Sequence, residues 1–160
     1  MSIAAVELSD LPEIRTVIEN AIRGRVVQSD QDAQGLVAVI DAILRDWEVD
    51  QSESVHLKYV LGGRIVGVAL VKNFWNLSSL FVEPAYQRQG VGRALIEAVV
   101  RECKLRTAKP VLKVNSSTVA VTFYLSLGFR QMGPGLDRPG GCVPLEYAFD
   151  CSERNGVRQL

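Results

Sequence analysis

Hydrophobic residues in the first fifty positions recur every three or four residues, the spacing of one helix face. In SDLPEIRTVIENAIR, Asp10 precedes the pattern as a predicted N-cap, with Glu13 three residues on and Pro12 in the first turn. The apolar positions of this predicted helix are Ile14, Val17, Ile18, Ala21 and Ile22. A second amphipathic helix is predicted from Leu36, Ile40, Ile43, Leu44 and Trp47.

The period then changes from helical to alternating, which is typical of strands. In SVHLKYVLGGRIVGVALV the alternating positions are Val55, Leu57, Tyr59 and Leu61. Gly62 and Gly63 follow, a pair suited to a two-residue turn, so we expect an antiparallel hairpin. A third strand, NLSSLFV, leads to Pro84.

The rest of the chain predicts helices alternating with strands. A glycine loop within YQRQGVGRALIEAVV opens a helix, and the strand PVLKV follows it. STVAVTFYLSLGF predicts a helix ending at Gly128, followed by strands near Phe129 and at CVPLEYAF that enclose the loop GPGLDRPGG. The expected order is two helices, three strands, helix, strand, helix and two strands. Residues 151–160, which end in SERNGVRQL, are expected to be a flexible tail after a single domain, residues 1–150.

Composition limits the class of protein. The 160 residues suffice for one domain with a core, and 48% of them are apolar. No apolar run approaches the roughly 18 residues of a membrane span, and the N-terminus lacks a signal-peptide pattern, so a cytoplasmic location is expected. The three cysteines (Cys103, Cys142 and Cys151) are widely spaced, which favours neither a disulfide framework nor a metal site.

The net charge of zero conceals an asymmetry along the chain. Residues 1–56 hold eleven Asp and Glu against four Lys and Arg, a balance of −7, so residues 57–160 carry +7. Either the acidic residues lie on solvated helix surface, or the first part faces a cation while the second holds an anion. The chain has no basic stripe of the kind that binds nucleic acid.

The glycine loop is the strongest chemical signal. Gly90 and Gly92 stand between Arg88 and Arg93 at the start of a helix, where free backbone N–H groups and the helix dipole bind phosphate. The loop does not match the dinucleotide-binding pattern G-x-G-x-x-G, because Leu95 occupies the position of the third glycine. The P-loop pattern is also absent.

Two segments resemble motifs of the GNAT superfamily of N-acetyltransferases. LFVEPAYQRQGVGRALIEAVV resembles motif A, with Gln87, Gly90 and Gly92 at its defining positions. VNSSTVAVTFYLSLGF resembles the second motif, and its matching residues are Asn115, Ala120, Tyr124, Gly128 and Phe129. The resemblance covers about Ile3 to Phe149. It implies a mixed α/β (α+β) fold with a largely antiparallel central sheet, a splayed parallel strand pair and about four flanking helices.

The resemblance also implies a site for acetyl-CoA, with no metal, between the segments SSLFV and VLKVN. The pantetheine arm is expected along Phe81 and Val82, and Asn115 and Tyr124 are expected to contact CoA. The diphosphate is expected on the loop formed by Gln87, Arg88, Gln89, Gly90, Val91, Gly92 and Arg93.

The implied reaction is direct attack of an amine on the thioester. By resemblance, the backbone N–H of Val82 is the oxyanion donor, and Tyr124 is the general acid or a hydrogen-bond donor to the departing sulfur. A free tyrosine with a pKa near 10 is a weaker acid than a thiol near 8.5, so full proton transfer is uphill by roughly 2 kcal/mol. The alternative for Tyr124 is a structural tyrosine whose hydroxyl bonds to backbone.

The general base is left open. Many relatives carry a glutamate on the strand before the loop, where this chain has only Ser78 and Ser79 before Glu83. His56, the single histidine, alternates out of phase with its neighbours and faces either the acceptor cleft or solvent. His56, Glu83 and a water-mediated route are the candidates.

The acceptor is expected to enter beside the first two helices and the GPGLDRPGG loop. The acidic excess in residues 1–56 suggests a cationic amine, such as a polyamine, an aminoglycoside or a lysine peptide. Two alternatives are an acyl-CoA-binding sensor or interaction module without turnover, and transfer of a longer acyl group or to another nucleophile. A homodimer is plausible for a protein of this fold.

Overall fold

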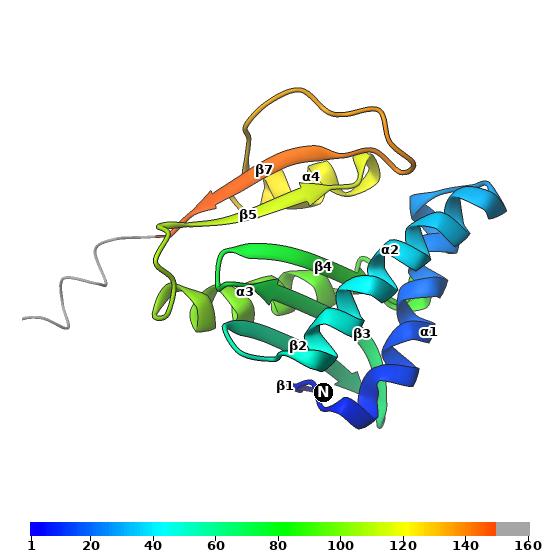
Figure 1. Ribbon diagram of the computed structural model, residues 1–160, viewed down its shortest axis with the longest axis horizontal. Coiled ribbons are helices and arrows are strands. Elements are labelled where there is room, and N and C mark those ends of the chain that lie inside the picture. Colours follow the sequence, from blue (N-terminus) through cyan, green and yellow to red (C-terminus); the bar gives the residue numbers. More distant parts are fainter. Residues whose placement is uncertain (150–160) are drawn as a thin grey trace, which may run out of the picture.

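The computed structural model describes residues 1–149, and the expected tail at 151–160 lies outside them. A seven-stranded sheet in the order β1-β2-β3-β4-β5-β7-β6 forms its centre (Figure 1). The strands are β1 (Ser2–Ala5), β2 (Ser54–Leu61), β3 (Arg64–Lys72), β4 (Asn76–Val82), β5 (Val111–Ser116), β6 (Arg130–Gln131) and β7 (Val143–Ala148). Neighbouring strands are antiparallel except for β4 and β5, which are parallel. The expected mixed fold with one parallel pair is therefore confirmed.

Within residues 1–149, four α-helices cover the two faces of this sheet. They are α1 (Leu11–Ala21), α2 (Asp30–Val49), α3 (Val91–Lys104) and α4 (Val121–Ser126). Single helical turns lie at η1 (Leu8–Asp10), η2 (Ile22–Val26), η3 (Pro84–Tyr86) and η4 (Thr118–Ala120). One core packs α1 and α2 on the sheet and the other packs α3 and α4 on the opposite face (Figure 1). β3 lies between both cores, which explains its continuous apolar sequence.

The predicted β2–β3 hairpin is present. Gly62 and Gly63 connect the strands with φ of +59° and +75°. Two positive φ angles are what a type I′ hairpin turn needs, and glycine adopts them without steric cost.

The start of the chain differs from the prediction in two respects. β1 was not anticipated, because a four-residue, mostly exposed edge strand carries too little periodicity. Asp10 makes no N-cap bond to α1; its carboxylate accepts from the Glu7 N–H at 2.8 Å and from the Lys58 ammonium at 2.6 Å. Glu13, the expected capping-box partner, accepts instead from the Ile65 N–H at 2.9 Å. Both carboxylates therefore tie the N-terminal segment to the sheet.

No helix among residues 1–149 is long and apolar enough to cross a membrane.

Candidate functional site

A cleft of about 800 Å³ opens where β4 separates from β5. The two strands pair only at Asn76 with Lys113 and at Leu77 with Val114. The next residue, Ser78, is a bulge, because the β3 partners of Leu77 and Ser79 are adjacent in sequence. A bulge bends its strand and ends regular pairing, so β4 diverges from β5 at this point.

Beyond the bulge, β4 presents unpaired backbone to the cleft. The Glu83 N–H donates to the Val66 carbonyl at 2.8 Å, and hydrogen bonds to one neighbour alternate along an antiparallel strand. The N–H groups of Leu80 and Val82 therefore point toward β5, into the cleft, whereas the backbone of Phe81 faces β3. The Val82 carbonyl accepts from Gln87 Nε2 at 3.0 Å. The Val82 N–H, which points into the cleft, is a donor that a ligand could use.

The glycine loop leads from β4 into α3 at one end of the cleft. Gly90, with φ of +85°, is the N-cap of α3 and has open space around it. Gly92 lines the cleft beneath Phe123 of α4. Both residues leave the first N–H groups of α3 accessible, and such groups bind anions.

Two cations stand on this loop. Arg88 and Arg93 line the cleft, are exposed, and form no ion pair within the described part of the chain. Of the other predicted loop residues, Gln89 does not line the cleft and donates to the Ala85 carbonyl at 3.2 Å. Val91 is buried against Gly67 of β3, so its side chain belongs to the core.

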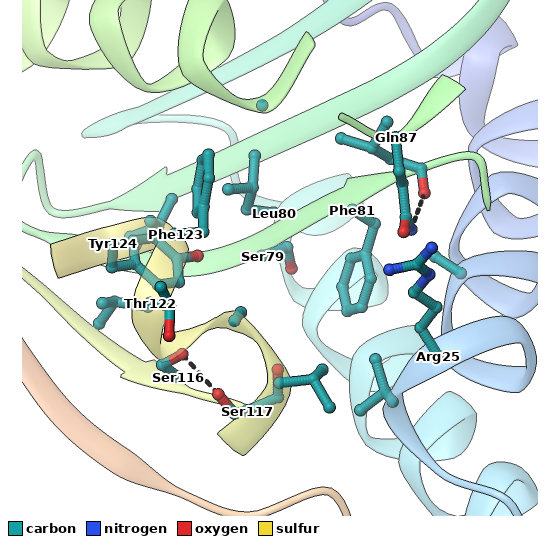
Figure 2. Close-up of a pocket in the computed structure, with 18 of the residues that line it drawn as sticks. Arg25, Ser79, Leu80, Phe81, Gln87, Ser116, Ser117, Thr122, Phe123 and Tyr124 are labelled. Carbon is teal, nitrogen blue, oxygen red and sulfur yellow. Dashed lines mark hydrogen bonds between the residues drawn. The ribbon is translucent and has the colours of Figure 1, made fainter. Parts of the chain in front are cut away.

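Tyr124 of α4 reaches the middle of the cleft (Figure 2). Its ring is held between Phe123 and Phe129, with centroids 5.1 Å from each, and only 4% of the residue is exposed. Its hydroxyl has no hydrogen-bond partner among the described residues, so no backbone group occupies it. Burial raises the pKa of this phenol well above its usual value.

A second unpartnered polar group, the hydroxyl of Ser79, lies buried in the cleft wall. It is 4% exposed, and its Oγ finds no hydrogen-bond partner in the described protein. In Figure 2 the hydroxyls of Ser79 and Tyr124 lie on facing walls of the cleft. Sequence reasoning noticed Ser79 only as the absence of a carboxylate. The bulge that turns it inward depends on the pairing with β3. Asn115, predicted to contact CoA, lines the β5 wall and is exposed.

Neither residue that we considered as a general base lines the cleft. His56 faces neither cleft nor solvent: it is 6% exposed, packed edge-on against Trp47 with ring centroids 4.5 Å apart. Burial lowers the pKa of its imidazole to about 4, despite the opposing effect of the Asp10 carboxylate. Glu83 accepts from Asn20 Nδ2 at 2.9 Å, between β4 and α1. The structure thus places Tyr124, Val82 and the glycine loop around one cleft, whereas His56 and Glu83 do not line it.

Residues of α1, η2 and α2 form one wall of the cleft, beside the end of β4. Ala21, Val26, Leu36 and Ile40 make this wall largely apolar, and Arg25 is its single charged residue among those described. Pro139 and Gly141, from the loop between β6 and β7, also line the cleft. Sequence reasoning did not single out Arg25.

The acidic residues of the N-terminal part lie outside the cleft. No Asp or Glu of residues 1–149 lines the cleft. Asp41 pairs with Arg15 at 2.7 Å and with Arg45 at 2.8 Å on the helix surface, and Asp10 pairs with Lys58. The positions of these carboxylates therefore do not support the expectation of a cationic acceptor.

Comparison with known proteins identifies the family. The family model described as acetyltransferase (GNAT) domain matches residues 26–143. The ribosomal protein bS18-alanine N-acetyltransferase of Escherichia coli K12 is 36% identical over 74 residues, 43% of this chain and 50% of that protein. The Haemophilus ducreyi protein of the same name is 31% identical over 83 residues, 49% of this chain and 57% of that one. The chain thus spans about half the length of the curated relatives it matches.

Solved structures extend the likeness to the whole fold. A GCN5-related N-acetyltransferase from Rhodopseudomonas palustris matches with a TM-score of 0.78 at 19% identity, covering 92% of this chain and 95% of that one. PaiA N-acetyltransferase from Thermoplasma acidophilum, solved in complex with coenzyme A, matches at 0.77 and 16% identity over 92% and 98% of the two chains. With a family model over most of its length and these matching folds, the chain belongs to the GNAT acetyltransferase family.

Proposed function

We propose that this protein transfers the acetyl group of acetyl-CoA to a primary amine of a small molecule or a peptide. The observation that carries the proposal is the cleft between β4 and β5, which joins an anion-binding glycine loop to unpaired strand backbone and the Tyr124 hydroxyl. The loop end is cationic, as a diphosphate requires, and the Tyr124 hydroxyl and unpaired strand N–H groups farther along could contact a thioester.

The residues present fit acetyl-CoA on physical grounds. The first N–H groups of α3, with Arg88 and Arg93, would hold the diphosphate. The β5-facing backbone of β4 at Leu80 would pair with the amide groups of the pantetheine arm, as an added strand does, which leaves the Val82 N–H for the thioester oxygen. Phe81 supplies a side chain rather than backbone, because its backbone faces β3.

Bound acetyl-CoA would supply a thioester that an amine attacks directly, so that a C–N bond forms, the C–S bond breaks and the amine's proton ends on the CoA sulfur. The Val82 N–H would stabilise the negative charge that develops on the thioester oxygen. Tyr124 would donate a hydrogen bond to the departing sulfur. Its raised pKa makes complete loss of its proton unfavourable, which favours the hydrogen-bonding role over that of a general acid.

Ser79 would accept a hydrogen bond from the attacking amine or from a water beside it. Because no Asp, Glu or His of the described chain lines the cleft, deprotonation of the amine would proceed through water. The amine must then be neutral when it attacks, and activity should rise with pH until the amine itself has lost its proton.

The same absence of a carboxylate favours one alternative, an acyl-CoA-binding sensor that catalyses no transfer. The two functions differ in one measurement: thiol release from acetyl-CoA, followed with and without polyamines, amino acids, aminoglycosides and peptides. Release stimulated by one class of amine supports the transferase. Saturable CoA binding with no stimulated release by any class supports the sensor.

A further inference from the structure

Arg25 stands out among the arginines of the N-terminal part. Of the four in residues 1–56, Arg15, Arg23 and Arg45 each pair with a carboxylate. Arg25 lines the cleft and forms no ion pair within residues 1–149. Figure 2 shows its side chain extending from the helical segment toward Gln87 and Phe81. Phe81 packs on the side of the sheet that α1 and α2 cover.

The segment that carries Arg25 is held on two sides. It is a single π-helical turn, η2, closed by a bond from the Val27 N–H to the Ile22 carbonyl at 3.2 Å. Gly24 contacts Pro84 so closely that a β-carbon there would lie 2.8 Å from Pro84 Cγ. On the other side, a β-carbon on Gly140 would lie 2.8 Å from Val26 Cγ1. These contacts fix the backbone of η2 between the end of β4 and the β6–β7 loop.

The charge of Arg25 determines which substrates this side of the cleft can bind. A substrate with several ammonium groups would meet Arg25 and no compensating carboxylate, so it would be repelled and left without partners. A guanidinium binds a carboxylate in two parallel hydrogen bonds, and one unpaired cation balances one negative charge. The apolar residues beside it suit a hydrocarbon portion between the amine and that charge.

We propose that Arg25 selects the acceptor, and that the acceptor is a primary amine that also carries a carboxylate. The inference rests on the proposed function for the existence of an amine acceptor. The binding of a carboxylate at Arg25 does not depend on turnover and can be measured without it. Arg25 is a specificity-determining residue here and takes no part in the bond-making steps.

The test compares amines in pairs that differ only in a carboxylate. The probes are phenylalanine and phenylalaninamide, 4-aminobutyrate and its amide, and the dipeptide Ala-Leu with its C-terminal amide. Because an α-amino group ionises at a lower pH in the amide than in the acid, each probe is compared between wild type and variant. Arg25→Gln should lower kcat/KM for the preferred carboxylate about tenfold or more. The kcat/KM for the corresponding amide and the KM of acetyl-CoA should stay unchanged.

Arg23→Gln is the matched control. Arg23 lies on the same segment, pairs with Glu19 and Asp30, and does not line the cleft, so its substitution should leave the carboxylate preference intact. An unchanged preference in Arg25→Gln would overturn the proposal, and so would a raised KM for acetyl-CoA, which would place Arg25 on the cofactor instead.

Calorimetric titration of the same probes into the CoA-saturated protein separates this proposal from the proposed function. Binding of a carboxylate but not its amide, lost in Arg25→Gln, supports the role of Arg25 even if no acetyl group is transferred. Binding of neither member of any pair, or equal binding of both, overturns it whether or not the protein is a transferase.

Discussion

Phe123 of α4 packs onto Gly92 at the start of α3, so closely that a β-carbon on Gly92 would lie 3.1 Å from Phe123 Cζ. The contact joins the two segments by which the sequence resembles its family, and it forms one wall of the cleft. Any side chain at position 92 must displace Phe123 or enter the space proposed for the diphosphate.

Gly92→Glu should therefore abolish CoA binding, raising Kd about 100-fold or more, because it adds both bulk and negative charge at an anion site. Gly92→Gln has the same bulk without the charge and should bind CoA more weakly than wild type but better than Gly92→Glu. Calorimetry gives both affinities, and circular dichroism should report an intact fold. Equal affinities for the two variants would show that charge at this position does not matter.

Tyr124→Phe should lower kcat about tenfold to a hundredfold, because a hydrogen bond to a charged group contributes about 1.5–3 kcal/mol. The KM of acetyl-CoA should change little, since phenylalanine keeps the ring contacts with Phe123 and Phe129. Steady-state kinetics at saturating amine measures both quantities. Full activity in this variant would make Tyr124 a structural residue.

The pH profile of the wild type adds a second check on Tyr124. Because burial raises the pKa of its phenol, ionisation of Tyr124 should cause no fall in kcat up to about pH 10. A loss of activity between pH 8 and 10 that disappears in Tyr124→Phe would contradict the buried, protonated hydroxyl.

Ser79→Ala should separate stability from activity. The Oγ of Ser79 is buried without a partner, so its removal should leave the free energy of unfolding unchanged or raise it slightly. If Ser79 positions the amine, the KM for the acceptor should rise about threefold to tenfold while the KM of acetyl-CoA is unchanged.

Ser78→Ala is the control for this variant, because the adjacent bulge residue already donates to the Asn76 carbonyl at 3.4 Å. Denaturant unfolding and steady-state kinetics on both variants complete the test. Ser79 has no role in the site if Ser79→Ala keeps wild-type kinetics.

His56 should make stability depend on pH. Its pKa of about 4 in the folded protein lies below the usual 6.5, so the unfolded chain binds the proton more readily. The contribution of neutral His56 is fully present above about pH 6.5 and is lost as pH falls toward 4.

His56→Phe should remove this dependence and raise stability near neutral pH, since both ring nitrogens are buried without partners and phenylalanine can keep the contact with Trp47. Urea denaturation at pH 4.5, 5.5 and 7.5 measures the difference. Activity at pH 7.5 should be unchanged; a large loss would restore His56 as a candidate base.

Local patterns predicted most of the elements. Helical spacing gave α1 and α2, alternation and Gly62-Gly63 gave the β2–β3 hairpin, and Gly90 marked the start of α3. Each signal depends on neighbours within one or two turns of chain, so it can be recognised without knowing the fold. The family could also be named from sequence, because its motifs place glycines where backbone must approach a ligand.

Contacts between distant segments decided what those patterns could not. The alternation of the strand predicted that His56 points away from the face of Val55, but not whether solvent, a cleft or a helix lies on that side. The structure places Trp47 of α2 against His56. The acidic excess of residues 1–56 suggested a cationic substrate, yet most of those side chains pair with nearby cations or tie the segment to the sheet.

Arg25 illustrates the division between sequence and tertiary structure. Nothing in its sequence distinguishes it from Arg23, two residues before it, since both lie in one polar stretch after the same helix. Gly24 packs on Pro84 and Gly140 packs on Val26, and such contacts place Arg25 at the cleft, whereas Arg23 pairs with Glu19 and Asp30. The sequence by itself determined the elements and the anion-binding loop, because both are encoded locally. The tertiary structure decided which charges face the substrate, because this depends on long-range packing.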